Sequence, residues 1–210
     1  MSTLSLNRRR LLRLGAVVTG ITSLDALGST GRIANAAAGQ SGSIEQGFLS
    51  KKADVRQIWD FVTVDQAQMG ITAMRNAMAA FESSYHKSHY LIVNLRGSAV
   101  IFGLNAAMWQ KYNIGKQFKV FNLGYDAKSN LNPLHPGLRA LQQRGAHVAV
   151  CHDALRGVGA QFMDTRRGSA SLGSIYQELA ANLLPDAQET PSGAALIAIA
   201  QQIGFTYAKE

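Results

Sequence analysis

The stretch "AHVAVCHDALRG", Ala146 to Gly157, joins a strand pattern to a helix pattern. Its first six residues are mostly small or β-branched, which is typical of a strand buried in a parallel sheet. A helix pattern follows from about Ala154. The only cysteine of the chain, Cys151, stands at the junction. The sequence therefore raises the question whether this thiol is chemically active or simply closes a buried strand.

Strand-like and helix-like segments alternate on both sides of this junction. Strands are predicted over residues 55–62, 89–97, 116–125 and 146–151, with a final edge strand over 205–210. Helices are predicted over residues 64–86, 101–113, 132–145, 171–184 and 190–204, besides the one that follows Cys151. Strands that alternate with helices of this length indicate βαβ units, so we expect an α/β fold with a mainly parallel sheet.

The composition is that of a globular protein. Of the 210 residues, 47% are hydrophobic and 16% are charged, which favours one domain with a sizeable core. The formal net charge is +8, but residues 1–36 alone hold five basic residues and one acidic residue. The other residues carry 16 basic and 12 acidic side chains without a long run of like charge. We therefore expect no nucleic-acid partner.

Residues 1–38 have the layout of an export signal. A basic start is followed by an apolar middle, Leu14 to about Leu27, and by a small-residue end, Ala34 to Ala38. The middle is too short and too polar to span a membrane, so we expect no stable membrane anchor after cleavage. Residues 39–53 are rich in Gly, Ser, Gln and Lys and are predicted to be a flexible linker, which leaves 54–210 as a single α/β domain.

The segment Asn7–Arg13 resembles the twin-arginine export motif. It departs from that motif at Asn7 and Leu11, where serine and phenylalanine are usual. An ordinary signal peptide and a basic amphipathic helix are the alternatives. The resemblance implies that the twin-arginine export machinery carries the folded protein to the periplasm or beyond. In that oxidising environment a lone cysteine cannot form an internal disulfide, so Cys151 must be buried, modified, paired between chains or chemically used.

Four stretches together resemble the DsrE/DsrF-like family of small sulfur-relay proteins, in its exported subgroup. They are "YLIVNLRGSAVIFGL", "MWQKYN", "NPLHPGLRALQQRGAHVAVCHDALRG" and "LLPDAQETPSGAALIAIAQQIGFTYAKE". The resemblance covers about Asp54 to Tyr207, and its main departure is Arg96-Gly97 where the family often has His-Gly. It implies a flavodoxin-like three-layer α/β sandwich that forms homo-oligomers, either trimers or hexamers. A short strand is implied near the start of the last stretch.

The same resemblance implies that Cys151 carries a persulfide, which it exchanges with a sulfur-donor or acceptor protein or with a small sulfur compound. Such a role as carrier or sulfurtransferase requires no cofactor. The carboxyl ends of parallel strands form the usual ligand site, and the helix after Cys151 favours a thiolate there. Asp153 either opposes this effect or caps the helix. The candidate catalytic residue is Cys151, and the candidate substrate-binding residues are Arg96, His135, His152 and Arg156.

Two other functions stay open at this point. Free cysteine is among the most buried residue types, so Cys151 could be a core residue of a non-catalytic oligomeric binding or assembly module. A periplasmic metal-binding protein could use His86 with His89, or Cys151 with His152, although no metal site is predicted with the spacing of a known motif.

Overall fold

The computed structural model describes residues 47–120, 131–165 and 170–209. They all belong to one compact unit of the chain, Ala37–Glu210. The predicted export signal, residues 1–38, and the first part of the predicted linker lie outside the described residues. Within the described ranges, no helix combines the length and the apolar character needed to cross a membrane.

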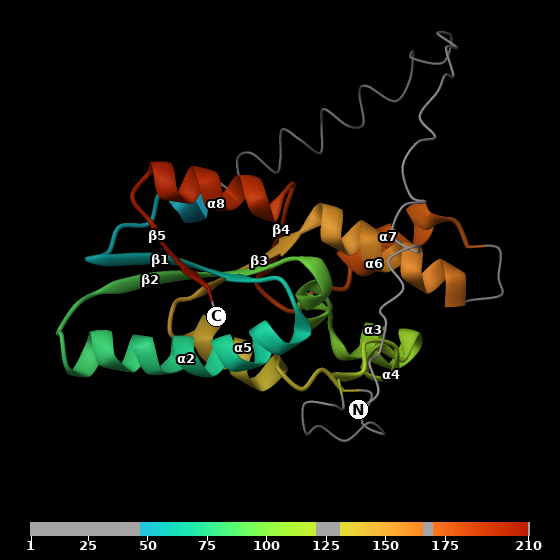
Figure 1. The fold of residues 1–210 in the computed structure, drawn as a ribbon, viewed down its shortest axis with the longest axis horizontal. Coiled ribbons are helices and arrows are strands. Elements are labelled where there is room, and N and C mark those ends of the chain that lie inside the picture. Colours follow the sequence, from blue (N-terminus) through green and yellow to red (C-terminus); the bar gives the residue numbers. More distant parts are fainter. Residues whose placement is uncertain (1–46, 121–130, 166–169, 210) are drawn as a thin grey trace, which may run out of the picture. The chain divides into compact units, whose positions relative to one another are not determined.

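The described strands form one sheet in which every neighbouring pair is parallel (Figure 1). The strands are β1 (Val55–Phe61), β2 (His89–Leu95), β3 (His147–Cys151), β4 (Ala187–Thr190) and β5 (Thr206–Lys209). Their order across the sheet is β4-β3-β2-β1-β5. Helices cover both faces of this sheet, so the predicted fold class, a flavodoxin-like three-layer α/β sandwich with a parallel sheet, is confirmed.

The helices are α2 (Val64–Ser83), α3 (Ala106–Tyr112), α4 (Ile114–Gln117), α5 (His135–Gln143), α6 (His152–Thr165), α7 (Leu172–Ala180) and α8 (Gly193–Gln202), with a 3-10 helix, η1 (Gly97–Gly103). The larger core lies on one face of the sheet, where Phe61, Val93 and Val150 pack with residues of α2, α5, α6 and α7. The smaller core lies on the other face, where Ile58 and Ile92 pack against α8. Consecutive strand residues point to opposite faces, which separates the two cores.

The strand order explains why α8 lies on the face of the sheet opposite α2, α5, α6 and α7. The connections from β1 to β4 all run in one direction across the sheet, whereas the last connection returns from β4 to β5. Crossovers between parallel strands are almost always right-handed. A connection that runs in the reverse direction must therefore place its helix on the opposite face, and Figure 1 shows α8 across the sheet from α2 and α5.

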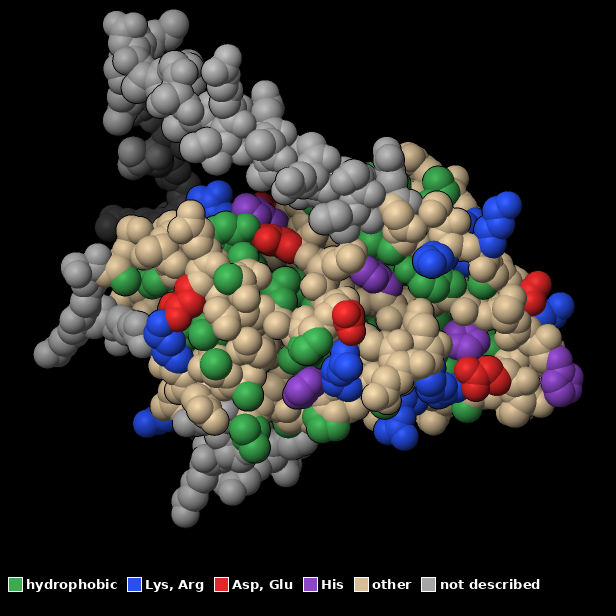
Figure 2. Space-filling view, turned by 180° about the vertical axis from the view of Figure 1, so that it is seen from behind, with side chains coloured by type: hydrophobic (Ala, Val, Ile, Leu, Met, Phe, Trp, Pro, Cys, Tyr) green, Lys and Arg blue, Asp and Glu red, His purple; other side chains and the backbone are tan. Residues whose placement is uncertain are grey.

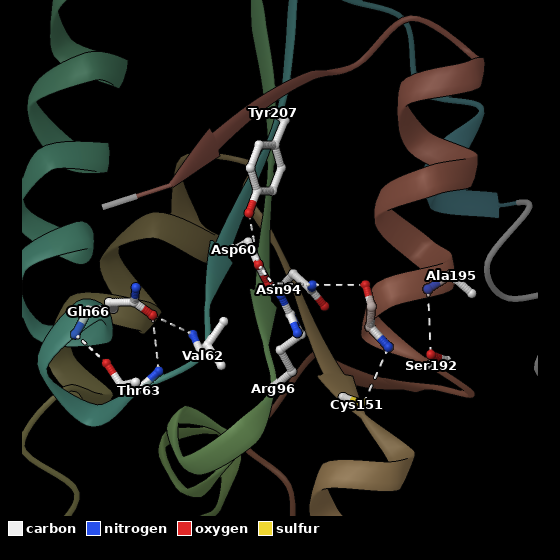
Figure 3. Close-up of polar contacts among 11 residues, drawn as sticks. Asp60, Val62, Thr63, Gln66, Asn94, Arg96, Cys151, Ser192, Ala195 and Tyr207 are labelled. Carbon is white, nitrogen blue, oxygen red and sulfur yellow. Dashed lines mark hydrogen bonds and ion pairs between the residues drawn. The ribbon is translucent and has the colours of Figure 1, made fainter.

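Local sequence signals fix the start of α2. Thr63 Oγ1 accepts a hydrogen bond from the Gln66 backbone N–H, and Gln66 Oε1 accepts one from the Thr63 backbone N–H, which together make a capping box (Figure 3). Gly70 then lets the helix approach β1, because a Cβ atom there would lie 2.0 Å from the Phe61 ring. The buried face of α2 includes Met74 and Met78 and is core packing.

Two predictions about local structure differ from the fold. The predicted strand over 116–125 is wrong in its described part, because Lys116 belongs to α4 and Phe118 caps that helix. Phe118 packs edge-on against Phe162, so the apolar pattern there reflects core packing of a turn. In the predicted linker, Phe48 is buried and stacks on His147 with ring centroids 3.9 Å apart. The described folded region therefore begins at least six residues before Asp54.

On the face shown in Figure 2, Lys and Arg side chains lie interspersed with Asp, Glu and His. This distribution differs from the basic stripe that is typical of a nucleic-acid interface.

Candidate functional site

The topological switch point of the sheet lies between β3 and β4. The chain leaves β3 into α6, which packs in the larger core, and it leaves β4 towards α8 on the other face. Cys151 and Thr190 are the last residues of these strands, and they are paired in register. Open α/β sheets bind ligands in the crevice outside the carboxyl ends of the strands at such a point. The fold therefore puts Cys151 at the position where a ligand site is most expected.

Two helix N-termini meet at the Cys151 sulfur. The helix α6 begins at the next residue, and α8 begins at Gly193. The Gly193 backbone N–H donates a hydrogen bond to Cys151 Sγ over 3.3 Å (Figure 3). Each N-terminus carries partial positive charge and unsatisfied N–H groups, so both helices stabilise an anionic sulfur. Cys151 itself is only 6% exposed, which restricts the approach of any reagent.

An ion pair between the partly exposed Arg96 and the buried Asp60 lies close enough to Cys151 for Arg96 to interact with it electrostatically. The Arg96 guanidinium binds the Asp60 carboxylate through two hydrogen bonds, Nε to Oδ1 and a terminal nitrogen to Oδ2, each 2.7 Å long. Asn94 Nδ2 donates to Asp60 Oδ1 over 3.0 Å, and the Tyr207 hydroxyl donates to Oδ2 over 3.0 Å. The Asp60 carboxylate is fully buried and accepts four hydrogen bonds, one from Asn94 on β2, one from Tyr207 on β5 and two from Arg96 in the turn after β2 (Figure 3).

The pKa values of the partners reflect this arrangement. The hydrogen bond to Asp60 raises the pKa of the Arg96 guanidinium above its ordinary value, so Arg96 stays charged. Burial, and then the hydrogen bond to Asp60, raise the pKa of the Tyr207 hydroxyl, so it stays a donor. The cation beside Cys151 is therefore permanent, and its charge is shared with a carboxylate.

Gly193 brings α8 into contact with this pair. A Cβ atom on Gly193 would lie 2.9 Å from Asn94 Oδ1 and 3.3 Å from Arg96 Cδ, so a larger residue would push α8 away from the sulfur. Asn94 Nδ2 also donates to the Gly193 carbonyl over 3.1 Å. Asn94 Oδ1 and Thr190 Oγ1 are buried and find no hydrogen-bond partner in the described part of the chain. Buried polar atoms without partners are uncommon in native proteins, and a bound polar ligand would satisfy them.

His152 and Arg156 belong to a different cluster. His152 Nδ1 lies 2.8 Å from Glu189 Oε1, and the Tyr176 hydroxyl donates to the same oxygen over 2.8 Å. Burial and the bond to Glu189 raise the pKa of Tyr176, and the charge of Arg156 opposes that rise, which places Arg156 close to this cluster. Glu189 pairs with Val150, one residue before the Cys151–Thr190 pair, so its side chain lies on the other face of the sheet.

The structure therefore brings one of the four predicted substrate-binding residues, Arg96, to Cys151. His152 and Arg156 face the α7 side. His135 starts α5 on the face of the larger core, and its backbone N–H donates a hydrogen bond to the Asn132 carbonyl over 3.3 Å. Within the described ranges, no side-chain contact joins His135 to Cys151.

Sequence reasoning missed Asp60, Asn94, Thr190 and Tyr207. A usable signal was present, because Asn94 is an isolated polar residue in the apolar run of β2 and Asp60 interrupts the apolar end of β1, Ile58 to Phe61. The two residues are paired in register, which only the sheet reveals. No group of three or more His, Cys, Asp or Glu side chains suited to a metal ion comes together in the described residues. His89 lies 3.5 Å from Glu82 instead.

Comparison with known proteins adds little about function. No family model matches the chain. No curated protein matches it either. Among solved structures, the chain is similar to a protein of unknown function from Methanobacterium thermoautotrophicum, with 16% sequence identity over 74% of this chain and 98% of that chain and a TM-score of 0.46.

Proposed function

We propose that the chain is an exported DsrE-like protein that binds or relays reduced sulfur as a persulfide on Cys151. The observation that carries the proposal is the hydrogen bond from Gly193 N–H to Cys151 Sγ at the point where α6 and α8 both begin. A persulfide is an anion at neutral pH, and it needs the same positive surroundings as a thiolate. Arg96 supplies a fixed cation nearby.

The chemistry requires only one cysteine. The Cys151 thiolate attacks the outer sulfur of a donor such as thiosulfate or a polysulfide. The S–S bond of the donor breaks, the leaving group departs with the electron pair, and a new bond joins the outer sulfur to Sγ. The Gly193 N–H and the two helix N-termini then stabilise the persulfide anion. A second thiolate or a nucleophile such as cyanide removes the outer sulfur and regenerates the Cys151 thiolate.

Mass spectrometry of the intact protein tests this proposal. We expect the folded chain to gain the mass of one sulfur atom after incubation with thiosulfate or polysulfide, and to lose it again after addition of cyanide. Cys151→Ser is the control, and it should gain nothing because the chain has no other cysteine. An unchanged mass in the folded chain, or an equal gain in Cys151→Ser, would contradict the proposal.

A second candidate is a non-catalytic binding or assembly module of the same fold. The burial of Cys151, at 6% exposure, favours it. Under this alternative the thiol reacts with a small alkylating reagent only after the protein unfolds. Assembly into trimers or hexamers belongs to both proposals and is measured by sedimentation. Export to the periplasm is measured by fractionation of cells that express the full chain.

A further inference from the structure

A shallow apolar groove lies at the far end of α8 from Cys151. Its volume is about 440 Å³, and its lining residues are Leu49, Ser50, Arg56, Ile199 and Ile203. Ile199 and Ile203 are each 41% exposed, although they are large aliphatic side chains. The volume is in the range of small-molecule sites, and none of the groups discussed at the Cys151 site lines it.

Arg56 is held in a fixed position at this groove. A terminal nitrogen of its guanidinium donates a hydrogen bond to the Ile203 carbonyl. The guanidinium carbon lies 4.8 Å from the centre of the Phe205 ring, which is a cation–π contact. Gly204 has φ +92°, and a Cβ atom there would lie 2.9 Å from the same guanidinium. The backbone thus turns closely around Arg56, and little side-chain entropy remains to be lost when a ligand binds.

The positive charge at the groove is not neutralised within the described part of the chain. No carboxylate there forms an ion pair with Arg56, nor with the exposed Lys51 and Lys52 that follow Ser50. The neighbouring acid, Asp54, accepts hydrogen bonds from Ser88 instead, and these bonds hold the pKa of Asp54 below its ordinary value. α8 contributes no charged residue to the groove. A fixed guanidinium beside an apolar floor complements a carboxylate that carries an apolar tail.

We propose that this groove binds a free monocarboxylate with an unbranched apolar chain of medium length. The carboxylate accepts hydrogen bonds from the Arg56 N–H groups that Ile203 does not use. The alkyl chain lies against Leu49 and covers Ile199 and Ile203, which removes the exposed surface of the two isoleucines from water. The site is independent of sulfur chemistry at Cys151, because it lies at the C-terminal end of α8 and Cys151 lies at its N-terminal end.

Titration of the full chain with octanoate, observed by NMR of isoleucine methyl groups, tests the proposal. We expect the methyl signals of Ile199 and Ile203 to shift in a saturable way, while those of the buried Ile92, Ile101 and Ile175 stay in place. Octanamide has the same tail without the charge, and acetate has the charge without the tail. Each should bind at least tenfold more weakly than octanoate. From butanoate to octanoate, each added CH₂ should tighten binding about two- to fourfold.

Two variants separate charge from packing. Arg56→Gln removes the positive charge, and it should weaken octanoate binding at least tenfold without changing octanamide binding. Ile199→Glu places a negative charge on the exposed floor and should abolish the octanoate shifts. Arg75→Gln removes an exposed arginine on α2 and should change nothing. Equal binding of octanoate and octanamide, or unchanged octanoate binding in Arg56→Gln, would overturn the proposal. If the methyl signals of Ile199 and Ile203 shift with protein concentration in the absence of ligand, the groove is a contact between copies of the chain. If a peptide ending in leucine binds more tightly than octanoate, the groove is a peptide site. Either result overturns the proposal.

Discussion

Replacement of Arg96 by glutamine should destabilise the protein strongly, because Asp60 is fully buried and Arg96 supplies two of its four donors. Loss of one partner of a buried ion pair costs about 3–5 kcal/mol, since the remaining charge stays buried. The Arg96 side chain is 32% exposed, so water can replace part of the lost interaction. We therefore expect Arg96→Gln to lower the free energy of unfolding by about 2–4 kcal/mol. For a domain of this size, that loss corresponds to a fall in Tm of roughly 5–15 °C.

The assay is urea unfolding followed by circular dichroism, with a double-mutant cycle as the control. In the variant that combines Asp60→Asn with Arg96→Gln, no unpaired charge is left in the core. It should recover at least half of the stability that Arg96→Gln loses. Tyr207→Phe removes a single donor and should cost about 1 kcal/mol. A cost below about 0.5 kcal/mol for Arg96→Gln, or a double variant whose cost equals the sum of the two single costs, would refute the reasoning.

Three further predictions concern other parts of the molecule. Gly193→Ala places a Cβ atom 2.9 Å from Asn94 Oδ1 and should lower the free energy of unfolding in urea by about 1–3 kcal/mol. Gly157→Ala is the control and should be neutral or stabilising, because open space surrounds the added Cβ. Equal effects of the two variants would contradict the tight approach of α8. Burial lowers the pKa of His147 from 6.5 to about 4, so the unfolded chain binds more protons between these values and stability should fall as the pH drops from 6.5 to 4. His147→Phe keeps a ring for stacking on Phe48 and should flatten this pH dependence of the unfolding free energy, while an unchanged slope would show that His147 is not its source. Tyr176→Phe breaks the hydrogen bond to Glu189 and should lower the free energy of thermal unfolding by about 1 kcal/mol. It should leave the alkylation rate of Cys151 unchanged, because the cluster of His152, Tyr176 and Glu189 lies on the other face of the sheet. A changed rate would contradict this separation of the two clusters.

Much of the fold could be predicted from the sequence because its signals are local. The β-branched run before Cys151 predicts a buried strand, and the apolar face of residues 64–86 predicts a helix. These patterns reflect burial on one side or on both sides of an element. The same reasoning fails at residues 116–120, where Phe118 and Val120 alternate with polar residues but pack in the core as part of a turn. Periodicity reports burial, and a short apolar pattern does not distinguish a strand from a turn that packs inward.

The candidate site was less predictable because it depends on strand order. The position of Cys151 at a strand–helix junction follows from the sequence, and so does the proximity of Arg96 at a neighbouring strand end. The return of the chain from β4 through α8 to β5 does not follow from the sequence. This return brings the Gly193 N–H to the Cys151 sulfur and the Tyr207 hydroxyl to Asp60. His152 lies next to Cys151 in sequence, but the start of α6 directs its side chain to Glu189. Adjacency in sequence is thus a poor guide to which side chains share a site at the edge of a sheet.

The most direct test of the account is the alkylation rate of Cys151 by iodoacetamide in the folded full chain, compared with the rate in the urea-unfolded chain. A sulfur-carrying thiol must be reached by a small electrophile without unfolding. Because Cys151 is only 6% exposed, we predict that the folded chain reacts more slowly than the unfolded chain but much faster than it unfolds, and that one alkyl group per chain is added. A folded chain that reacts only as fast as it unfolds would show that Cys151 is a core residue and would contradict the proposed function.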